Sequence, residues 1–145
     1  MSNVVIRLAN IDDLEKIASI EKSYPYETYS KIELTKMFGY DYYRFLIAEI
    51  DDKIVGYICA TIIMEECNLM KIIVGEKFRT NGIGKKLVNK LKDICMEQNV
   101  KYIYLEVRST NSVAIEFYKK LGFEFDGIRK GYYNGVDACI YRLII

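Results

Sequence analysis

The stretch that decides the fold is G-E-K-F-R-T-N-G-I-G, which runs from Gly75 to Gly84. It follows an apolar run over 68–74 that predicts a strand, and it opens a stripe of apolar residues at helical spacing. That stripe consists of Ile83, Leu87, Val88, Leu91, Ile94 and Cys95. Two glycines at a helix start allow close approach to the backbone, and the free N–H groups of the first helical turn favour an anion there.

Two lysines, Lys85 and Lys86, follow the second glycine at a helix N-terminus, where the helix dipole disfavours positive charge. A bound anion would offset that cost, while an ordinary glycine-containing turn stays open as the alternative. Two common phosphate motifs do not fit. A Walker loop requires glycine where Arg79 stands, and a dinucleotide fingerprint requires glycine where Leu87 stands.

Working outward from this loop, the pattern predicts a strand, two helices, three strands, a helix, a strand, a helix and two strands. The predicted strands cover 4–7, 45–50, 53–64, 68–74, 102–107, 123–129 and 138–144, and the last two form a hairpin across 132–137. The helices begin after Asn10, after Ser30, near Gly84 and at Asn111. Hairpin strands followed by a strand–helix–strand crossover predict one α/β domain over residues 1–145. Its sheet is mixed and mostly antiparallel, flanked by about four helices.

Composition narrows the classes of function. The 145 residues are 51% apolar, which excludes a disordered chain, and they contain no histidine, which excludes His-based triads and His-ligated metal sites. The 21 basic and 20 acidic residues leave a net charge of +1. We therefore expect the chain to bind neither nucleic acid directly nor an anionic membrane surface, because it has no large excess of positive charge to attract either.

The cysteines and the apolar runs indicate the compartment. Cys59, Cys67, Cys95 and Cys139 include no close pair, so we expect free thiols in a reducing cytoplasm and no metal. The N-terminus lacks the pattern of a secretory signal, and the longest weakly polar run, 54–64, is too short to cross a bilayer. A cytoplasmic protein is the expectation, with a monomer and a weak dimer both left open.

The strand K-Y-I-Y-L-E-V-R, residues 101–108, carries a carboxylate. Alternation places Leu105 and its apolar neighbours on one face, and Glu106 and Arg108 on the other. A carboxylate in a buried strand is costly unless it has a partner, and such a group suits a general base. A purely structural contact between Glu106 and Arg108, or with a tyrosine, is an equally open alternative.

Arg79, Gly82 and Gly84 match the loop signature of the GNAT acetyltransferase superfamily: Arg or Gln, two residues, Gly, one residue, then Gly or Ala. The stretch L-E-V-R-S-T-N-S-V-A-I-E-F-Y-K-K-L-G-F, Leu105 to Phe123, resembles bacterial RimI-type enzymes, the ribosomal-protein alanine N-acetyltransferases. So does Y-Y followed by D-A over 132–138. The resemblance covers essentially the whole chain. It implies the GNAT fold and transfer of acetyl from acetyl-coenzyme A to an amine, with the N-terminus of a protein as acceptor and no metal.

The same resemblance assigns roles to residues. It implies that coenzyme A contacts Ile72, Ile73, Val74, Arg79, Thr80, Asn81, Gly82, Ile83, Gly84, Lys85 and Asn111. Glu106 matches the general base, acting through a water, and Tyr118 matches the acid that protonates the departing thiolate. From the residues alone, Asn111 could equally cap its helix, and Tyr118 could be an ordinary core aromatic.

The acceptor region departs from the RimI pattern. Val136 stands where glutamate is usual, and S-Y-P-Y-E-T-Y, residues 23–29, is unusually rich in tyrosine. We expect an acceptor slot walled by Tyr24, Tyr26, Tyr132 and Tyr133, although surface tyrosines packing a flexible loop are the alternative. Two other functions stay open. One is acetylation of a small amine, such as a polyamine or an antibiotic, and the other is a non-catalytic acyl-coenzyme A sensor.

Overall fold

The computed structural model describes residues 3–79 and 81–145, and within them seven strands form one sheet. The strands are β1 (Val5–Leu8), β2 (Tyr43–Ile50), β3 (Lys53–Ile63), β4 (Glu66–Val74), β5 (Tyr102–Arg108), β6 (Glu124–Tyr133) and β7 (Val136–Ile144). The α-helices are α1 (Leu14–Glu21), α2 (Lys31–Phe38), α3 (Ile83–Glu97) and α4 (Ser112–Lys120). Short 3-10 turns, η1 (Ile11–Asp13) and η2 (Glu76–Phe78), precede α1 and α3. The predicted order of elements is confirmed.

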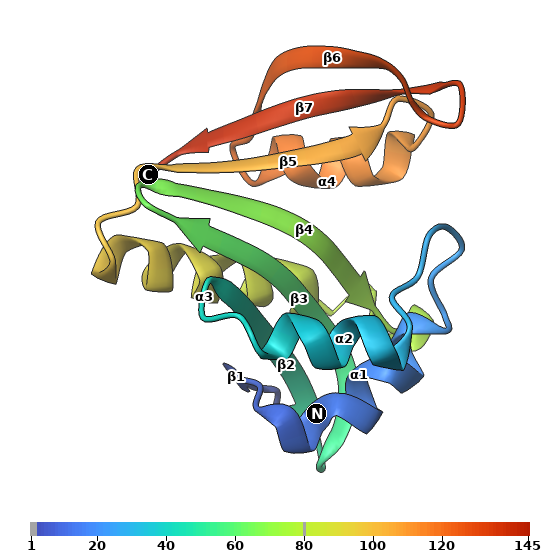
Figure 1. Cartoon of the computed structure of the whole chain (residues 1–145), viewed down its shortest axis with the longest axis vertical. Helices are drawn as coiled ribbons and strands as arrows, with labels where there is room; N and C mark the ends of the chain where they lie inside the picture. Colours follow the sequence, from blue (N-terminus) through green and yellow to red (C-terminus); the bar gives the residue numbers. More distant parts are fainter. Residues whose placement is uncertain (1–2, 80) are drawn as a thin grey trace.

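The sheet has the strand order β1-β2-β3-β4-β5-β7-β6. Every neighbouring pair is antiparallel except β4 and β5, which are parallel, so the predicted mixed and mostly antiparallel sheet is confirmed. In Figure 1, β5, β6, β7 and α4 form one half of the molecule, and β1 to β4 with the other helices form the second. None of the described helices is long and apolar enough to span a bilayer.

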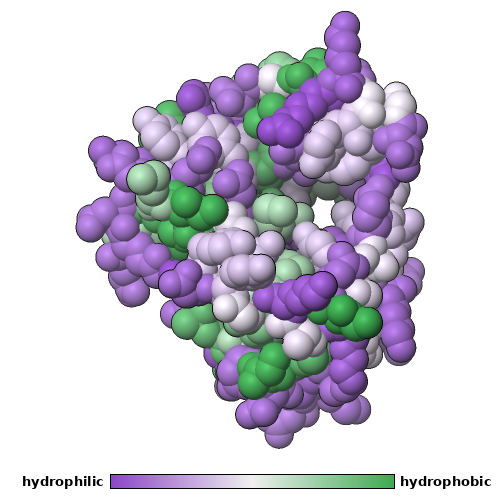
Figure 2. All heavy atoms as spheres, in the orientation of Figure 1, coloured by the Kyte–Doolittle hydropathy of each residue, from purple (hydrophilic) through white to green (hydrophobic). Residues whose placement is uncertain are grey.

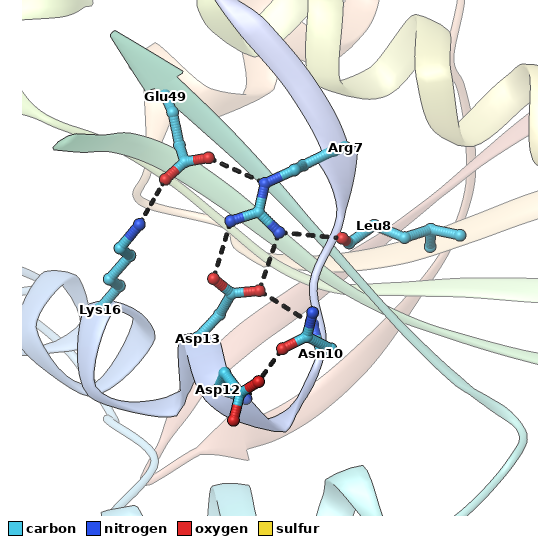
Figure 3. Close-up of polar contacts among 7 residues, drawn as sticks. All are labelled: Arg7, Leu8, Asn10, Asp12, Asp13, Lys16 and Glu49. Atoms are coloured by element: carbon cyan, nitrogen blue, oxygen red, sulfur yellow. Dashed lines mark hydrogen bonds and ion pairs between the residues drawn. The ribbon is translucent and has the colours of Figure 1, made fainter. Parts of the chain in front are cut away.

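The N-terminal strand is tied to the first helix by charge (Figure 3). The guanidinium of Arg7 donates to both carboxylate oxygens of Asp13, at 2.8 and 2.9 Å, and its Nε donates to Glu49 at 2.8 Å. Lys16 donates to the other Glu49 oxygen at 2.6 Å. The hydrogen bond from Arg7 lowers the pKa of Asp13, and those from Lys16 and Arg7 lower the pKa of Glu49. The helical segment starts with η1, and Asn10 caps that turn as predicted.

The final hairpin is confirmed, but its turn is shorter than predicted. Strand β6 continues to Tyr133 and β7 begins at Val136, so only Asn134 and Gly135 lie in the turn. Both have positive φ, 49° and 94°, as a two-residue hairpin turn of the Asn-Gly type requires. The longer predicted turn is wrong, because Asn-Gly closes the hairpin in two residues and both strands continue up to it.

Two apolar clusters lie on opposite faces of the sheet. The larger one packs α3 and α4 against the strands, and its fully buried members include Leu87, Val88 and Leu91. The smaller one lies beneath α1 and α2, where Ile17 and Leu34 are both fully buried. A residue's cluster therefore shows which face of the sheet its side chain occupies.

A bulge in β4 reverses the alternation of its side chains. Cys59 of β3 pairs with Lys71 and the next residue, Ala60, pairs with Leu69, so Met70 is an extra residue. Leu69 belongs to the cluster beneath α3, whereas Ile73 belongs to the cluster beneath α1 and α2. In a regular strand these two residues, four apart, would share one face. The bulge therefore turns Lys71 and Ile73 toward α1 and α2.

The parallel strands β4 and β5 stay together for only part of their length. They pair from Glu66 and Tyr102 to Leu69 and Leu105. Beyond that point no residue of β4 pairs with β5 in the described chain. Figure 1 shows the two strands close together near the C-terminus and parting toward the other end. The separation starts beside the bulge and leaves main-chain groups of 70–74 facing an opening.

Candidate active site

A cleft of about 1450 Å³ lies where β4 and β5 part, and Figure 2 shows a hollow in this face of the molecule. Residues from both faces of the sheet line it. The exposed Val113 of α4 stands on one side, and the exposed Tyr132 of β6 and Tyr26 of the α1–α2 loop stand on the other. The cleft therefore passes through the sheet, with one mouth on each face.

The mouth beside α3 has the groups that could hold an anion. Gly82 is the N-cap of this 15-residue helix, with φ +73° and no side-chain cap, and the first turn contains no acidic residue. Lys86 N–H donates to the Gly82 carbonyl at 3.1 Å, whereas the described residues show no hydrogen bond from the N–H groups of 83–85. Gly82, Gly84 and Lys85 all line the cleft. These donors and the Lys85 charge fit a phosphate group.

Gly84 has a second reason to be glycine. A Cβ at this position would lie 2.9 Å from Cζ of Phe117, so α3 and α4 could not keep their present contact. Gly82 is different, because an added Cβ would meet nothing within 4 Å and only its positive φ favours glycine. The predicted close approach of a ligand to the backbone therefore has room at Gly82, whereas Phe117 occupies the space beside Gly84.

The other residues predicted to bind coenzyme A are placed unevenly. Ile72, Ile73, Val74 and Arg79 line the cleft, and Arg79 Nε donates to the Val74 carbonyl at 3.2 Å. The side chain of Ile73 is buried beneath α1 and α2, and that of Ile83 is buried beneath the sheet. Ile73 therefore offers only its main chain to a ligand, and Ile83 does not line the cleft. Asn81 is not among the residues lining the cleft, and Thr80 lies outside the described residues.

Asn111 and Tyr118 both face the cleft from α4. The side-chain oxygen of Asn111 accepts from Ala114 N–H at 3.2 Å, so its predicted capping role is confirmed and its amide nitrogen remains for another partner. Tyr118 packs edge-on against Phe117 and Phe123, with ring centroids 5.4 and 5.7 Å away. Burial raises the pKa of Tyr118, and so do the neighbouring Tyr24 and Tyr133. Its phenol is therefore a proton donor and not an anion.

Glu106 reaches the cleft from β5 with one oxygen unused. Its Oε2 is buried and makes no hydrogen bond within the described residues. The nearest cation is Arg129, whose Nε lies 3.5 Å away, at ion-pair distance but without hydrogen-bond geometry. The predicted structural contact with Arg108 is wrong, because Arg108 pairs with Glu27 instead, and the predicted tyrosine contact reaches only the Glu106 carbonyl, from Tyr133. An unsatisfied carboxylate oxygen at a cleft is suited to accept a proton.

The tyrosine-rich segment 23–29 is anchored by a buried ion pair that sequence reasoning missed. Lys71 Nζ donates to Glu21 Oε1 at 2.9 Å and to the Glu27 carbonyl at 2.7 Å, and it lies over the rings of Tyr24 and Tyr29. Tyr29 N–H donates to Glu21 at 2.9 Å, and the Tyr57 hydroxyl donates to the same carboxylate. These tyrosines cover a cation, so the alternative of a loosely packed surface loop does not fit.

The four tyrosines predicted to wall the acceptor slot come together at the second mouth. Tyr24 and Tyr26 pack edge-on at 5.6 Å, and Tyr132 and Tyr133 do so at 5.0 Å. Tyr133 donates to the Glu106 carbonyl at 3.4 Å. Burial and the charge of Glu106 raise the pKa of Tyr133 to about 12. Tyrosine side chains from both walls thus surround the strand that carries Glu106.

Comparison with known proteins agrees with this geometry. Residues 11–123 match the model of the Acetyltransferase (GNAT) family. An N-alpha-acetyltransferase of Sulfolobus acidocaldarius is 34% identical over 94% of this chain and 89% of its own length. A ribosomal protein bS18-alanine N-acetyltransferase of Haemophilus ducreyi is 31% identical over 92% of this chain and 91% of its own. The crystal structure of the ribosomal-protein-S18-alanine N-acetyltransferase from Escherichia coli superposes with a TM-score of 0.90 at 26% identity, covering 99% and 94% of the two chains.

Proposed function

Because the chain belongs to the acetyltransferase (GNAT) family and is an acetyl-coenzyme A-dependent N-acetyltransferase, we propose that its acceptor is the N-terminal α-amine of a protein. Two relatives that cover almost the whole chain carry names for this reaction, one of them on a ribosomal protein. Residues 1–145 then form a single N-acetyltransferase domain. The observation that carries the proposal is Glu106 Oε2, buried and without a hydrogen bond, inside a cleft that opens on both faces of the sheet.

The donor fits the mouth beside α3. The N–H groups of 83–85 and the Lys85 ammonium would hold the pyrophosphate, and the unpaired edge of β4 over 72–74 would hold the pantetheine arm through main-chain hydrogen bonds. When bound, acetyl-coenzyme A supplies a thioester and a good thiolate leaving group. The free N–H groups beside the bulge would polarise the acetyl carbonyl.

Glu106 would accept the proton of the acceptor amine, directly or through a water. A peptide α-amine has a pKa of about 7.7–8.0 against about 10.4 for lysine, so at neutral pH a tenth or more of it is already unprotonated. A carboxylate therefore suffices as the base in a chain that has no histidine. Its Oε2, buried and without a hydrogen bond, is free for this contact.

Tyr118 would return a proton to the departing sulfur from its Oη. Burial keeps its pKa above the usual value, which ensures that the phenol is protonated when the thiolate forms. Its ring is held edge-on between Phe117 and Phe123, and this packing restricts the direction in which the hydroxyl points. Positioning both groups around the amine and the thioester provides much of the rate gain.

The charges at the second mouth favour a peptide end over a small polycation. Glu106, Glu27 and Asp126 line the cleft, and each lies beside an arginine: Arg129, Arg108 and Arg142 respectively. A carboxylate whose charge is already balanced by an arginine attracts a polyamine only weakly. Glu66, which begins β4, also lines the cleft, at the end of the strand where β4 and β5 still pair.

The test is mass spectrometry of peptides with varied first residues, incubated with acetyl-coenzyme A and the protein. We expect a single acetyl shift on peptides with a free α-amine, and no shift on matched peptides whose α-amine is blocked but which contain lysine. Acetylation of the blocked peptides would reassign the acceptor to a side chain. A complete lack of peptide acetylation, together with turnover of a polyamine, would overturn the proposal.

A further inference from the structure

Two cations, one on each of the parting strands, hold the same loop. Lys71 lies on β4 just past the bulge, and Arg108 is the last residue of β5. Both contact Glu27 of the loop over 23–29: its carbonyl accepts a hydrogen bond from Lys71, and its carboxylate pairs with Arg108. In Figure 1 this loop, in blue between α1 and α2, rises toward the gap between β4 and β5. The loop therefore spans the opening on the side away from α3.

Arg108 also joins the two aromatic walls of that mouth. Its guanidinium carbon lies 4.5 Å from the ring centroid of Tyr26 and 4.6 Å from that of Tyr133. Tyr26 belongs to the loop after α1 and Tyr133 to the end of β6, so one planar cation contacts walls more than a hundred residues apart in sequence. Its side chain is only 17% exposed, which strengthens its contacts with the rings, whereas its counter-charge Glu27 is 60% exposed.

We propose that Arg108 is a positioning residue for the acceptor, which sets the width of the second mouth by clasping Tyr26 to Tyr133 with Glu27 as its counter-charge. This inference rests on the proposed function, since it takes the second mouth as the acceptor entrance. The donor mouth lies on the other face of the sheet and shares none of these contacts. Loss of the clasp therefore affects acceptor binding and leaves donor binding intact.

The residue type matters as well as the charge. A guanidinium is planar and offers its faces to two rings while its edge pairs with a carboxylate, whereas an ammonium is compact and strongly hydrated. Arg108→Lys therefore keeps the attraction to Glu27 but loses the double ring contact. Arg108→Met keeps only an apolar stem. The acceptor KM should rise in the order wild type, Arg108→Lys, Arg108→Met.

The experiment compares steady-state kinetics of these variants on a peptide with a free α-amine that the wild type acetylates, with coenzyme A affinity measured separately by calorimetry. We expect the acceptor KM of Arg108→Met to rise on the order of tenfold or more, with coenzyme A affinity unchanged within about twofold. Tyr26→Leu, on the exposed loop, should raise acceptor KM without disturbing the core. Arg44→Met, which removes an arginine of β2 outside the cleft, is the matched control and should leave both constants unchanged.

The outcomes separate this inference from the function on which it rests. If the wild type acetylates no peptide, the proposed function fails. If the wild type acetylates peptides and both Arg108→Met and Tyr26→Leu keep the wild-type acceptor KM, the clasp is overturned. A loss of coenzyme A affinity in Arg108→Met as large as the rise in its acceptor KM would also overturn the clasp, because a general distortion of the site would then explain both effects. Should Arg108→Met fail to fold, Tyr26→Leu and Arg108→Lys decide the question.

Discussion

Leu69 of β4 and Leu105 of β5 are the last residues at which the two parallel strands pair, and every proposed catalytic contact lies beyond them. Lys71 and the unpaired edge 72–74 follow Leu69, and Glu106 follows Leu105 directly. A strand that loses its partner exposes main-chain donors and acceptors, which must find other partners. This separation provides, in the interior of the sheet, the main-chain groups that a thioester substrate can use.

Replacing Glu106 with glutamine should lower turnover by about 10²–10⁴-fold, because an amide cannot accept the proton of the amine. Coenzyme A affinity should stay the same, since the donor mouth is on the opposite face. Steady-state rates and calorimetry measure the two effects. Glu116→Gln, an exposed glutamate of α4, is the control and should behave like wild type. Wild-type turnover in Glu106→Gln would remove Glu106 from the mechanism.

Tyr118→Phe should also slow turnover while leaving donor affinity unchanged, because the ring remains and only the proton donor is lost. The defect should be smaller with a thioester whose thiol is more acidic, since such a leaving group needs less protonation. Tyr141→Phe, another buried tyrosine, is the matched control and should keep the wild-type rate. An undiminished rate in Tyr118→Phe would assign the acid to a different group.

Gly82→Val should weaken coenzyme A binding, because a branched side chain would stand beside the N–H groups of the first turn of α3. The variant also loses stability, since φ +73° is strained for valine. Gly122→Val provides the control, because φ is +97° there and the site lies outside the cleft. Thermal unfolding should show a loss in both variants, and calorimetry a loss of affinity only in Gly82→Val. Intact coenzyme A affinity in Gly82→Val would contradict the anion site.

Acid should destabilise the fold through the Arg7 cluster. Asp13 and Glu49 have folded-state pKa values below their ordinary 3.8 and 4.5, so their contribution to stability is present above about pH 4.5 and is lost as the pH falls through the folded values. Urea unfolding at neutral and acidic pH measures this loss. Arg7→Gln should reduce it, whereas Lys31→Gln, from an exposed pair with Glu15, should not. An equal acid loss in Arg7→Gln and wild type would show that this cluster is not responsible.

Local patterns in the sequence predicted much of the fold. The stripe from Ile83 to Cys95, the cap at Ser30 and the alternation of 102–107 are each decided by nearby residues, and all three are confirmed. The clasp around Arg108 and the burial of Lys71 could not be predicted in this way. Lys71 reaches Glu21 only because Met70 is an extra residue, and a bulge of this kind has no local signal in the chain.

The contacts of the candidate site show the same division. Most of the described residues that the resemblance implied, Glu106 and Tyr118 among them, line one cleft, but their partners come from distant segments. Arg129 pairs with Glu106, and Arg108 pairs with Glu27 rather than with Glu106. Such pairings depend on how β6 and the α1–α2 loop are packed on the sheet. No spacing along the sequence encodes them.

The passage through the sheet has a consequence for the order of events in catalysis. If the donor and the acceptor enter by the separate mouths proposed above, neither has to leave before the other arrives, and both can be present when the amine meets the thioester. The acetyl group then passes in one displacement and need not be stored on the protein. Double-reciprocal plots of velocity against the concentration of one substrate, at several fixed concentrations of the other, would give intersecting lines, as expected for a ternary complex. The parting of two strands would thereby set the kinetic order of the enzyme.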